Sequence, residues 1–318
     1  GNELTTAETH TSDDALKSVR IDLSAPKVTV AKLFSSTTAV NTVEYPGYKL
    51  ARVTDTVTLE FETDERVLNP VAKINGSEVI VTRQLDAEDS EITTGTKWQA
   101  SYPVTESLGT QDIDSISFEV VSLNDPSGSA LAATANNTAT TDSSKVRIDL
   151  SAPQVTVAKL LSSNTAVNAV EYPDYQLARP TDTVTLEFET DERVLNPVAR
   201  INGQPVTVGS QEDEAGIADA SGTKWQAEYT VATPSAGAVD IDAAFEIVSL
   251  NDPSGNALGA TPAATTDSSR VRIDLSAPKV TVAKLLSSNS GDHAGDYDGN
   301  VKLARVTDNV TLEFETGE

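Results

Sequence analysis

The chain repeats itself, and this constrains its fold more than any other feature. The heptapeptide Arg-Ile-Asp-Leu-Ser-Ala-Pro begins at Arg20, at Arg147 and at Arg272, so successive copies start 127 and then 125 residues apart. A unit of about 125 residues has the usual size of a domain that buries its own core, which the short repeats of solenoids cannot do alone. The sequence therefore predicts independent domains in a row.

Further landmarks set the expected boundaries. Leu59-Glu-Phe-Glu-Thr recurs at Leu186 and at Leu312, and Gly95-Thr-Lys-Trp recurs at Gly222. We expect the sequence to have been cut from a longer array. The predicted units are the C-terminal strand of a preceding repeat at 1–23, repeat 1 at 24–150, repeat 2 at 151–275 and the N-terminal part of a third repeat at 276–318.

Alternation of apolar and polar residues predicts that each unit is built from β-strands. In repeat 1 the alternation is clear at 57–61, 98–102, 116–120 and 146–148, with shorter candidates at 28–33, 71–74 and 79–82. The pair Asn75-Gly76 lies between the last two and is a hairpin signal. No stretch shows a helical stripe. Seven short strands separated by turns predict an all-β fold, an antiparallel β-sandwich.

The two tryptophans of the chain, Trp98 and Trp225, occupy the same position in successive repeats. A large aromatic side chain on a middle strand of a sandwich is more often a core residue than a ligand-binding one. We therefore predict that each tryptophan is the core anchor of its own repeat.

Composition excludes several classes of function. The net charge is −25, which disfavours binding to nucleic acid or to an anionic membrane. Cysteine is absent, so no disulfide or thiolate metal site can form, and no apolar run is long enough to span a bilayer. The only histidines, His10 and His293, stand in unrelated positions, so no repeated catalytic base is present and we expect no enzyme.

Three motifs together resemble a known family. They are Ile148-Asp-Leu-Ser-Ala-Pro-Gln-Val-Thr, Gly222-Thr-Lys-Trp-Gln-Ala-Glu-Tyr-Thr-Val and Asn251-Asp-Pro-Ser-Gly-Asn. Their order is similar to that in the bacterial immunoglobulin-like tandem repeats of giant adhesins, which are often exported by type I (RTX-type) secretion. The resemblance implies tandem immunoglobulin-like sandwiches arranged as an elongated rod. It also implies a secreted, extracellular, cell-surface protein of cell adhesion and biofilm.

Acidic loops predict calcium at the joints between repeats. In an immunoglobulin-like topology the loops after the second and sixth strands lie where the chain enters the domain, and calcium prefers six to eight hard oxygen ligands. Part of this expectation rests on the resemblance. The predicted ligands are Asp22, Asp64, Glu65, Asn124 and Asp125 at one joint, Asp149, Asp191, Glu192, Asn251 and Asp252 at the next, and Asp274 at the third.

Weaker candidates accompany these ligands. From the far end of the preceding domain, Asp112 and Asp114, and their counterparts Asp240 and Asp242, are expected to approach a joint. A separate acidic loop carries Asp296, Asp298 and Asn300.

Alternatives stay open at several of these positions. Asp and Asn before Pro or Gly also form turns that need no metal, and Gly317 stands where Asp64 and Asp191 would fall. The stretch Tyr45-Pro-Gly-Tyr48 suits either a ligand platform or the packing of a long connection, and packing is the favoured interpretation.

The expected function is mechanical. Short Ser-Ala-Pro linkers limit backbone freedom, so calcium at each joint would turn the string of domains into a stiff stalk that contacts only its own neighbouring repeats. The alternatives are a subunit of an extracellular lattice or filament, and a carbohydrate-binding accessory module.

Overall fold

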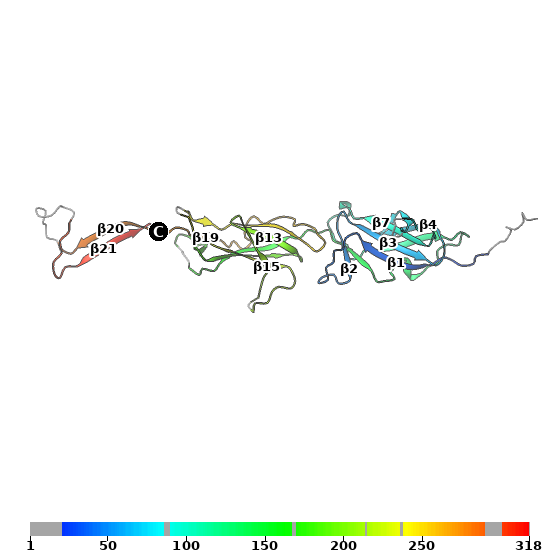
Figure 1. The fold of residues 1–318 in the computed structure, drawn as a ribbon, viewed down its shortest axis with the longest axis horizontal. Coiled ribbons are helices and arrows are strands. Elements are labelled where there is room, and N and C mark those ends of the chain that lie inside the picture. The colour runs from blue at the N-terminus through cyan, green and yellow to red at the C-terminus, as the bar shows by residue number, and fades with distance from the viewer. Residues whose placement is uncertain are drawn as a thin grey trace, which may run out of the picture.

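The computed structural model describes residues 21–85, 90–166, 170–213, 215–235, 238–289 and 301–317. Almost every regular element among them is a β-strand, so the fold is all-β, as the sequence predicts. The domains follow one another along a single long axis, with repeat 1 and repeat 2 end to end and a two-stranded piece beyond them (Figure 1).

The described part of repeat 1 contains nine strands and two short 3-10 helices, named η1 and η2. The strands are β1 (Val28–Ser35), β2 (Tyr48–Ala51), β3 (Thr56–Thr63), β4 (Leu68–Ile74), β5 (Ser77–Val79), β6 (Val81–Arg83), β7 (Lys97–Pro103), β8 (Phe118–Asn124) and β9 (Lys145–Ile148), and the helices are η1 (Glu106–Leu108) and η2 (Ala135–Asn137).

Two layers of strands enclose the core of repeat 1. One sheet has the order β1-β3-β7-β6 and the other β5-β4-β8, while β2 pairs in parallel with β9. In the lettering of immunoglobulin domains these are A-B-E-D and C′-C-F, with the second half of strand A beside strand G. Buried side chains from both layers, such as Phe61 of β3 and Ala72 of β4, share one core.

Repeat 2 has the same order of strands, β10-β12-β16-β15 facing β14-β13-β18, with β11 parallel to β19. Its elements are β10 (Val155–Ser162), β11 (Gln176–Ala178), β12 (Thr183–Thr190), β13 (Leu195–Ile201), β14 (Gln204–Val206), β15 (Val208–Ser210), β16 (Lys224–Thr230), β17 (Ile241–Asp242), β18 (Phe245–Asn251) and β19 (Val271–Ile273).

The alternating pattern determines which side chains fill the core. In β3, Val57, Leu59 and Phe61 are fully buried, while the intervening residues are half-buried. Phe61 lies opposite Trp98 of β7, which is itself buried in the same core. Trp225 packs against the core of repeat 2. Trp98 is therefore a core residue, as predicted from the sequence, whereas Trp225 is only partly buried and lies at the edge of its core.

The hairpin forms as predicted, but the strand after it is shorter. Asn75 and Gly76 both have positive φ angles, 51° and 75°, as a tight two-residue hairpin turn requires. The stretch predicted as one strand at 79–82 breaks at Ile80, because β5 pairs with β4 in one sheet whereas β6 pairs with β7 in the other. The chain thus crosses between the two layers at this residue.

The joints lie between the last strand of one repeat and the first strand of the next. Residues 149–154 connect β9 to β10, and residues 274–279 connect β19 to β20. The predicted boundaries at 150 and 275 fall in these two segments. Residues 1–20, most of the expected strand of a preceding repeat, lie outside the described residues.

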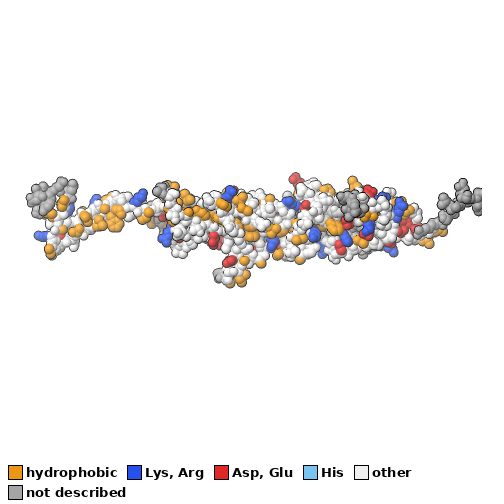
Figure 2. Space-filling view, in the orientation of Figure 1, with side chains coloured by type: hydrophobic (Ala, Val, Ile, Leu, Met, Phe, Trp, Pro, Cys, Tyr) orange, Lys and Arg blue, Asp and Glu red, His pale blue; other side chains and the backbone are white. Residues whose placement is uncertain are grey.

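Only one strand pair of the third repeat is described, β20 (Val280–Ser287) with β21 (Val310–Thr316). Apolar side chains gather on its surface (Figure 2), and Leu285 and Phe314 are 66% and 60% exposed. The matching Leu160 and Phe188 of repeat 2 are buried. Positions that are buried in repeat 2 are therefore exposed in this strand pair. Among the described residues, no helix has the length and apolar character needed to cross a membrane.

Candidate metal centre at the joint between repeats

Asp149 is held in place by the last strand of repeat 1. It directly follows β9, and its backbone N–H donates to the carbonyl oxygen of Ala51 at 2.8 Å, which continues the pairing of β9 with β2. The Asp149 side chain is only 4% exposed. The linker therefore begins with a carboxylate that is held in a fixed position and enclosed between the two repeats.

Glu192 lies in the turn between β12 and β13 of repeat 2. The hydroxyl of the buried Thr190 donates to the Glu192 carbonyl oxygen at 2.7 Å and fixes this turn. Thr63 makes the same bond to Glu65 in repeat 1. In both repeats the strand thus ends in a buried threonine, and this threonine fixes the backbone of the glutamate two residues later.

Asp252 follows β18 and organises the Asp-Pro-Ser-Gly-Asn turn. Its Oδ1 accepts from the N–H groups of Gly255 and Asn256 at 2.6 and 2.8 Å, and its Oδ2 accepts from Asn256 Nδ2 at 2.9 Å. Only 1% of the residue is exposed. An Asp at the first position of a turn can form such bonds without a metal.

These three residues converge and form the Asp149 cluster. Each of Asp149, Glu192 and Asp252 offers a carboxylate oxygen within 4.8 Å of the others. Asp22, Glu65 and Asp125 converge in the same way and form the Asp22 cluster. Each cluster joins the linker to two loops of the repeat that follows it, those after β3 and β8 in repeat 1 and those after β12 and β18 in repeat 2.

The Asp149 cluster is an acidic group without a cationic partner. No ion pair between described residues involves its three carboxylates. Arg147 is close but buried, and its guanidinium is bound to Asp112 at 2.8 Å and to Asp114. The three carboxylates therefore repel one another in a region with little water to screen them.

Burial and repulsion raise the pKa values of the cluster. Burial raises the pKa of Glu192 to about 8, and the negative charges of Asp149 and Asp252 add to it. Burial also raises the pKa of Asp149 to about 6, against a hydrogen bond from Ser254 that lowers it. The pKa of Asp252 is raised by burial despite its bonds to Asn256. Ionising all three groups is therefore costly unless a cation compensates the charge.

Two polar residues that sequence reasoning missed complete the network. The Ser254 hydroxyl donates to Asp149 Oδ2 at 2.6 Å, and Asn256 Nδ2 donates to the Asp149 carbonyl oxygen at 3.2 Å. Both belong to the turn of Asp252, so this turn binds the linker directly. The motif Asp-Pro-Ser-Gly-Asn carried the signal, because its polar residues follow the Asp at fixed spacing.

The other predicted ligands of these joints have different partners. Asp64 and Asp191, which neighbour Glu65 and Glu192, accept the N–H of Lys27 and of Gln154 at 2.8 Å and fasten the start of the first strand of each repeat. Neither joins a cluster. The backbones of Asn124 and Asn251 end β8 and β18 in bridges to Ala130 and Ala257.

The candidates from the preceding domain bind the linker. Asp112 Oδ1 accepts from the N–H groups of Leu150 and Ser151 at 2.8 and 3.0 Å, and its charge contributes to the raised pKa values of Asp149 and Glu192. Asp240 accepts equivalent bonds from Leu275 and Ser276. Asp114 and Asp242 pair instead with Arg147 and Arg272.

The third joint is described only in part. Asp274 Oδ1 accepts from the N–H of Ser276 at 3.1 Å, as Asp22 Oδ1 accepts from the N–H of Ser24 at the first joint. Glu318, which matches Glu192, lies outside the described residues, and so does the acidic loop of Asp296, Asp298 and Asn300.

The Asp149 cluster fits a hard divalent cation. Its donors are all oxygens, two of its three carboxylates are almost fully buried, and its charge is uncompensated. Calcium favours such ligands, whereas metals that favour imidazole or thiolate have no matching donors in it. Asp149, Glu192 and Asp252 would hold the ion, which would supply positive charge between the two repeats.

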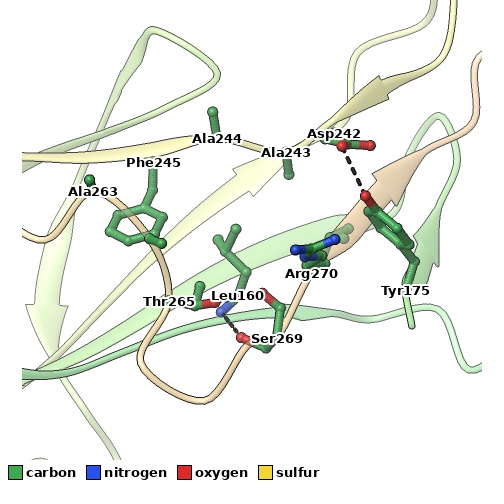
Figure 3. Close-up of a pocket in the computed structure, with 12 residues that line it drawn as sticks. Leu160, Tyr175, Asp242, Ala243, Ala244, Phe245, Ala263, Thr265, Ser269 and Arg270 are labelled. Atoms are coloured by element: carbon green, nitrogen blue, oxygen red, sulfur yellow. Dashed lines mark hydrogen bonds between the residues drawn. The ribbon is translucent and has the colours of Figure 1, made fainter.

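A cavity in repeat 2 lies away from the Asp149 cluster and shares no residue with it. This groove of about 380 Å³ lies between β10, β18 and the segment before β19 (Figure 3). Its polar groups are already engaged, since Ser269 Oγ accepts from Leu160 N and the Tyr175 hydroxyl donates to Asp242. The matching groove of repeat 1 contains no tyrosine.

In each complete repeat the tyrosine of the Tyr-Pro pair packs on an arginine of the last strand. Arg147 lies 4.0 Å from the ring centre of Tyr45, and Arg272 lies 5.3 Å from that of Tyr172. These contacts fasten the long connection between the first two strands. They favour the interpretation that the tyrosines pack this connection over the interpretation that they form a ligand platform.

Comparison with known proteins gives structural neighbours only. No protein-family model and no curated protein sequence matches the chain. A chimeric titin Z1Z2-Z1Z2 tandem carrying a fibronectin peptide is 12% identical, with 72% of this chain and 95% of that chain covered and a TM-score of 0.21. The I9–I11 tandem of titin is 12% identical, with 78% and 65% covered and a TM-score of 0.26. Rst D1-D2 is 9% identical, with 76% and 99% covered and a TM-score of 0.26.

Scores this low carry no argument about function. The architecture rests on the strand order of the chain itself, with A-B-E-D facing C′-C-F and the second half of strand A parallel to strand G in both complete repeats. By that order the chain is a tandem of immunoglobulin-like antiparallel β-sandwiches.

Proposed function

We propose that this chain is an extender segment of a larger bacterial surface adhesin, and that calcium at the joints stiffens it. Its role is to hold a binding domain away from the cell surface, in the extracellular space where adhesion and biofilm formation take place. The chain performs no catalysis, and its partners are its own neighbouring repeats.

The Asp149 cluster is the observation that carries this proposal. Its ligands come from two sides of a joint, with Asp149 in the linker and Glu192 and Asp252 in the loops of the following repeat. A cation held by all three would fix repeat 2 on the end of repeat 1. Binding of calcium would also stabilise the fold. A free calcium concentration of a hundred times the dissociation constant adds about 2.7 kcal/mol to the free energy of unfolding.

The test is calcium titration of the whole chain by isothermal calorimetry, followed by melting and small-angle scattering with and without chelator. We expect calcium to bind, to raise the melting temperature and to narrow the range of particle lengths. Magnesium should act more weakly, because it keeps its waters and requires a tighter octahedron.

Matched variants assign the effect to the joint. The double variant Asp149→Asn with Glu192→Gln should lose one bound calcium per chain, while Asp174→Asn, an exposed acid in the β10–β11 connection, should lose none. If the double variant binds as many ions as the wild type, the cluster is only a set of turn residues. Assembly into sheets, or saturable binding of glycans, would favour the lattice protein or the carbohydrate-binding module instead.

A further inference from the structure

Arg52 of repeat 1 reaches across the joint. It lies in the turn between β2 and β3, and its guanidinium Nη1 donates a hydrogen bond to the carbonyl oxygen of Gly255 in repeat 2. The bond joins side chain to backbone and involves none of the clustered carboxylates. It is therefore a contact between repeats that needs no cation.

A strained turn presents this arginine. Arg52 N–H donates to Asp55 Oδ2 at 2.9 Å, and Asp55 N–H donates back to the Arg52 carbonyl oxygen at 3.0 Å. Thr54 between them has a φ of 82°, a region that a β-branched residue rarely adopts. Thr54 N–H donates to the Val104 carbonyl oxygen at 3.0 Å, which holds the turn against the end of β7.

The same turn recurs in every repeat. Arg179-Pro-Thr-Asp and Arg305-Val-Thr-Asp repeat the sequence Arg52-Val-Thr-Asp, and Thr181 and Thr307 have φ angles of 80° and 93°. In these two copies the arginine side chain is 76% and 82% exposed. A costly backbone conformation is thus kept three times, each time beside an arginine at the same position of the repeat.

The receiving turn has a matching shape. Gly255 has a φ of 94°, and a Cβ atom placed on it would lie 3.2 Å from Arg52 Cζ. Gly128, its counterpart in repeat 1, has a nearly identical φ of 96°, but a Cβ there would meet nothing within 4 Å. The two glycines therefore share one backbone requirement and differ in whether an arginine lies against them.

We propose that the Arg-x-Thr-Asp turn is a docking element whose partner is the Asp-Pro-Ser-Gly turn of the next copy of this repeat. One turn presents a guanidinium at the end of a repeat, and the other presents a backbone carbonyl free of side-chain cover. Together they set the orientation of the joint independently of calcium. The array then has one preferred shape before any cation binds.

Spin labels on the whole chain test this docking. The chain has no cysteine, so Ser122→Cys and Ser249→Cys add single labels at equivalent exposed positions of β8 and β18. Pulsed electron resonance in chelator then gives the distribution of distances across the joint. Arg52→Ala should lower the ratio of docked to undocked joints about tenfold, because a hydrogen bond to a charged donor contributes roughly that factor or more.

Two controls distinguish docking from general damage. Arg179→Ala removes the matching arginine that faces away from the measured joint and should leave the distribution unchanged. Gly255→Ala should broaden it, whereas Gly128→Ala, which carries the same backbone strain, should not. An unchanged distribution in Arg52→Ala, or equal broadening in Arg179→Ala, overturns the proposal. Because the measurement is made in chelator, its result is independent of whether calcium binds.

Discussion

In the absence of calcium, acid should stabilise repeat 2. The perturbation is a change of pH from 8 to 5 in chelator. Burial raises the pKa of Glu192 from 4.5 to about 8 and that of Asp149 from 3.8 to about 6, so the folded chain binds more protons than the unfolded chain over this range. The free energy of unfolding therefore falls as the pH rises through the window, the reverse of ordinary acid denaturation.

The expected size follows from the same shifts. Each pKa unit corresponds to 1.36 kcal/mol. Only the part of each shift that lies between pH 5 and pH 8 counts, which gives about 1.4 kcal/mol for Asp149 and a larger figure for Glu192. Water reaches the half-buried Glu192 and screens part of its cost, so we expect about 2 to 4 kcal/mol in all. At about 4 °C per kcal/mol for a domain of this length, the melting temperature should rise by roughly 10 °C.

Other acids of repeat 2 act at lower pH and do not mask the effect. Hydrogen bonds from Ser269 and from Arg272 hold the pKa values of Asp267 and Asp242 below the ordinary range. Their contribution to stability is present above the unfolded pKa of about 3.9 and is lost only as the pH falls further. The interval from pH 5 to pH 8 thus isolates the Asp149 cluster, in which the pKa of Asp252 is raised as well.

The assay is thermal melting followed by the fluorescence of Trp225, with Trp98→Phe to silence repeat 1. Asp149→Asn with Glu192→Gln should flatten the pH dependence and should raise the melting temperature at pH 8 in chelator. Calcium should remove the wild-type trend, because the ion keeps the carboxylates charged. A melting temperature that stays constant or falls between pH 8 and pH 5 would contradict this prediction.

Three further predictions concern the domains and the linker. Trp98→Ala should destabilise repeat 1 by about 3–5 kcal/mol and leave the calorimetric transition of repeat 2 in place; one shared shift would contradict independent repeats. Gly203→Ala, at a φ of 74°, should cost about 1 kcal/mol in urea unfolding, whereas Gly209→Ala, with an ordinary φ and open space around it, should cost less. Asp112→Asn should destabilise repeat 1 by about 1–3 kcal/mol in the same assay, because it weakens the bonds to Arg147 and to the linker.

Much of the fold was accessible from the sequence because period-two alternation is a local signal. It found β3 and β7, where buried and polar residues alternate over seven or eight positions. It missed β2, which has only four residues, Tyr48–Ala51, and pairs with β9. That pairing is parallel and joins residues almost a hundred positions apart, so nothing in the local pattern identifies it.

The candidate site was predictable in part for a similar reason. Loops at one end of a sandwich converge whatever their exact conformation, and this placed Asp149, Glu192 and Asp252 near one joint. Local sequence does not show which acid of the pair Asp191-Glu192 turns inward. Asp191 binds the backbone of Gln154 instead, and that choice depends on the path of the linker.

Arg52 makes a contact that the sequence of a single repeat does not reveal. A lone arginine in a turn is ordinary, and its partner Gly255 is 203 residues away. The informative fact is its recurrence before Thr-Asp in all three copies, which a comparison of the repeats with one another reveals. Internal repeats thus carry information about contacts between domains as well as within them.

The Asp149 cluster shows that a joint involves residues of both repeats. Asp125 and Asp252 occupy equivalent turns and are both enclosed, yet their pKa values shift in opposite directions. Burial works to raise the pKa of Asp125, but hydrogen bonds from Ser127 and Ser129 outweigh it, whereas at Asp252 burial prevails over its own turn. Repeat 1 reaches the turn of Asp252 through Arg52, and the charge of its Asp112 contributes to the raised pKa values of Asp149 and Glu192. The carboxylates of the cluster come from the linker and the following repeat, and the preceding repeat supplies the cover that makes their charge costly and a cation favourable.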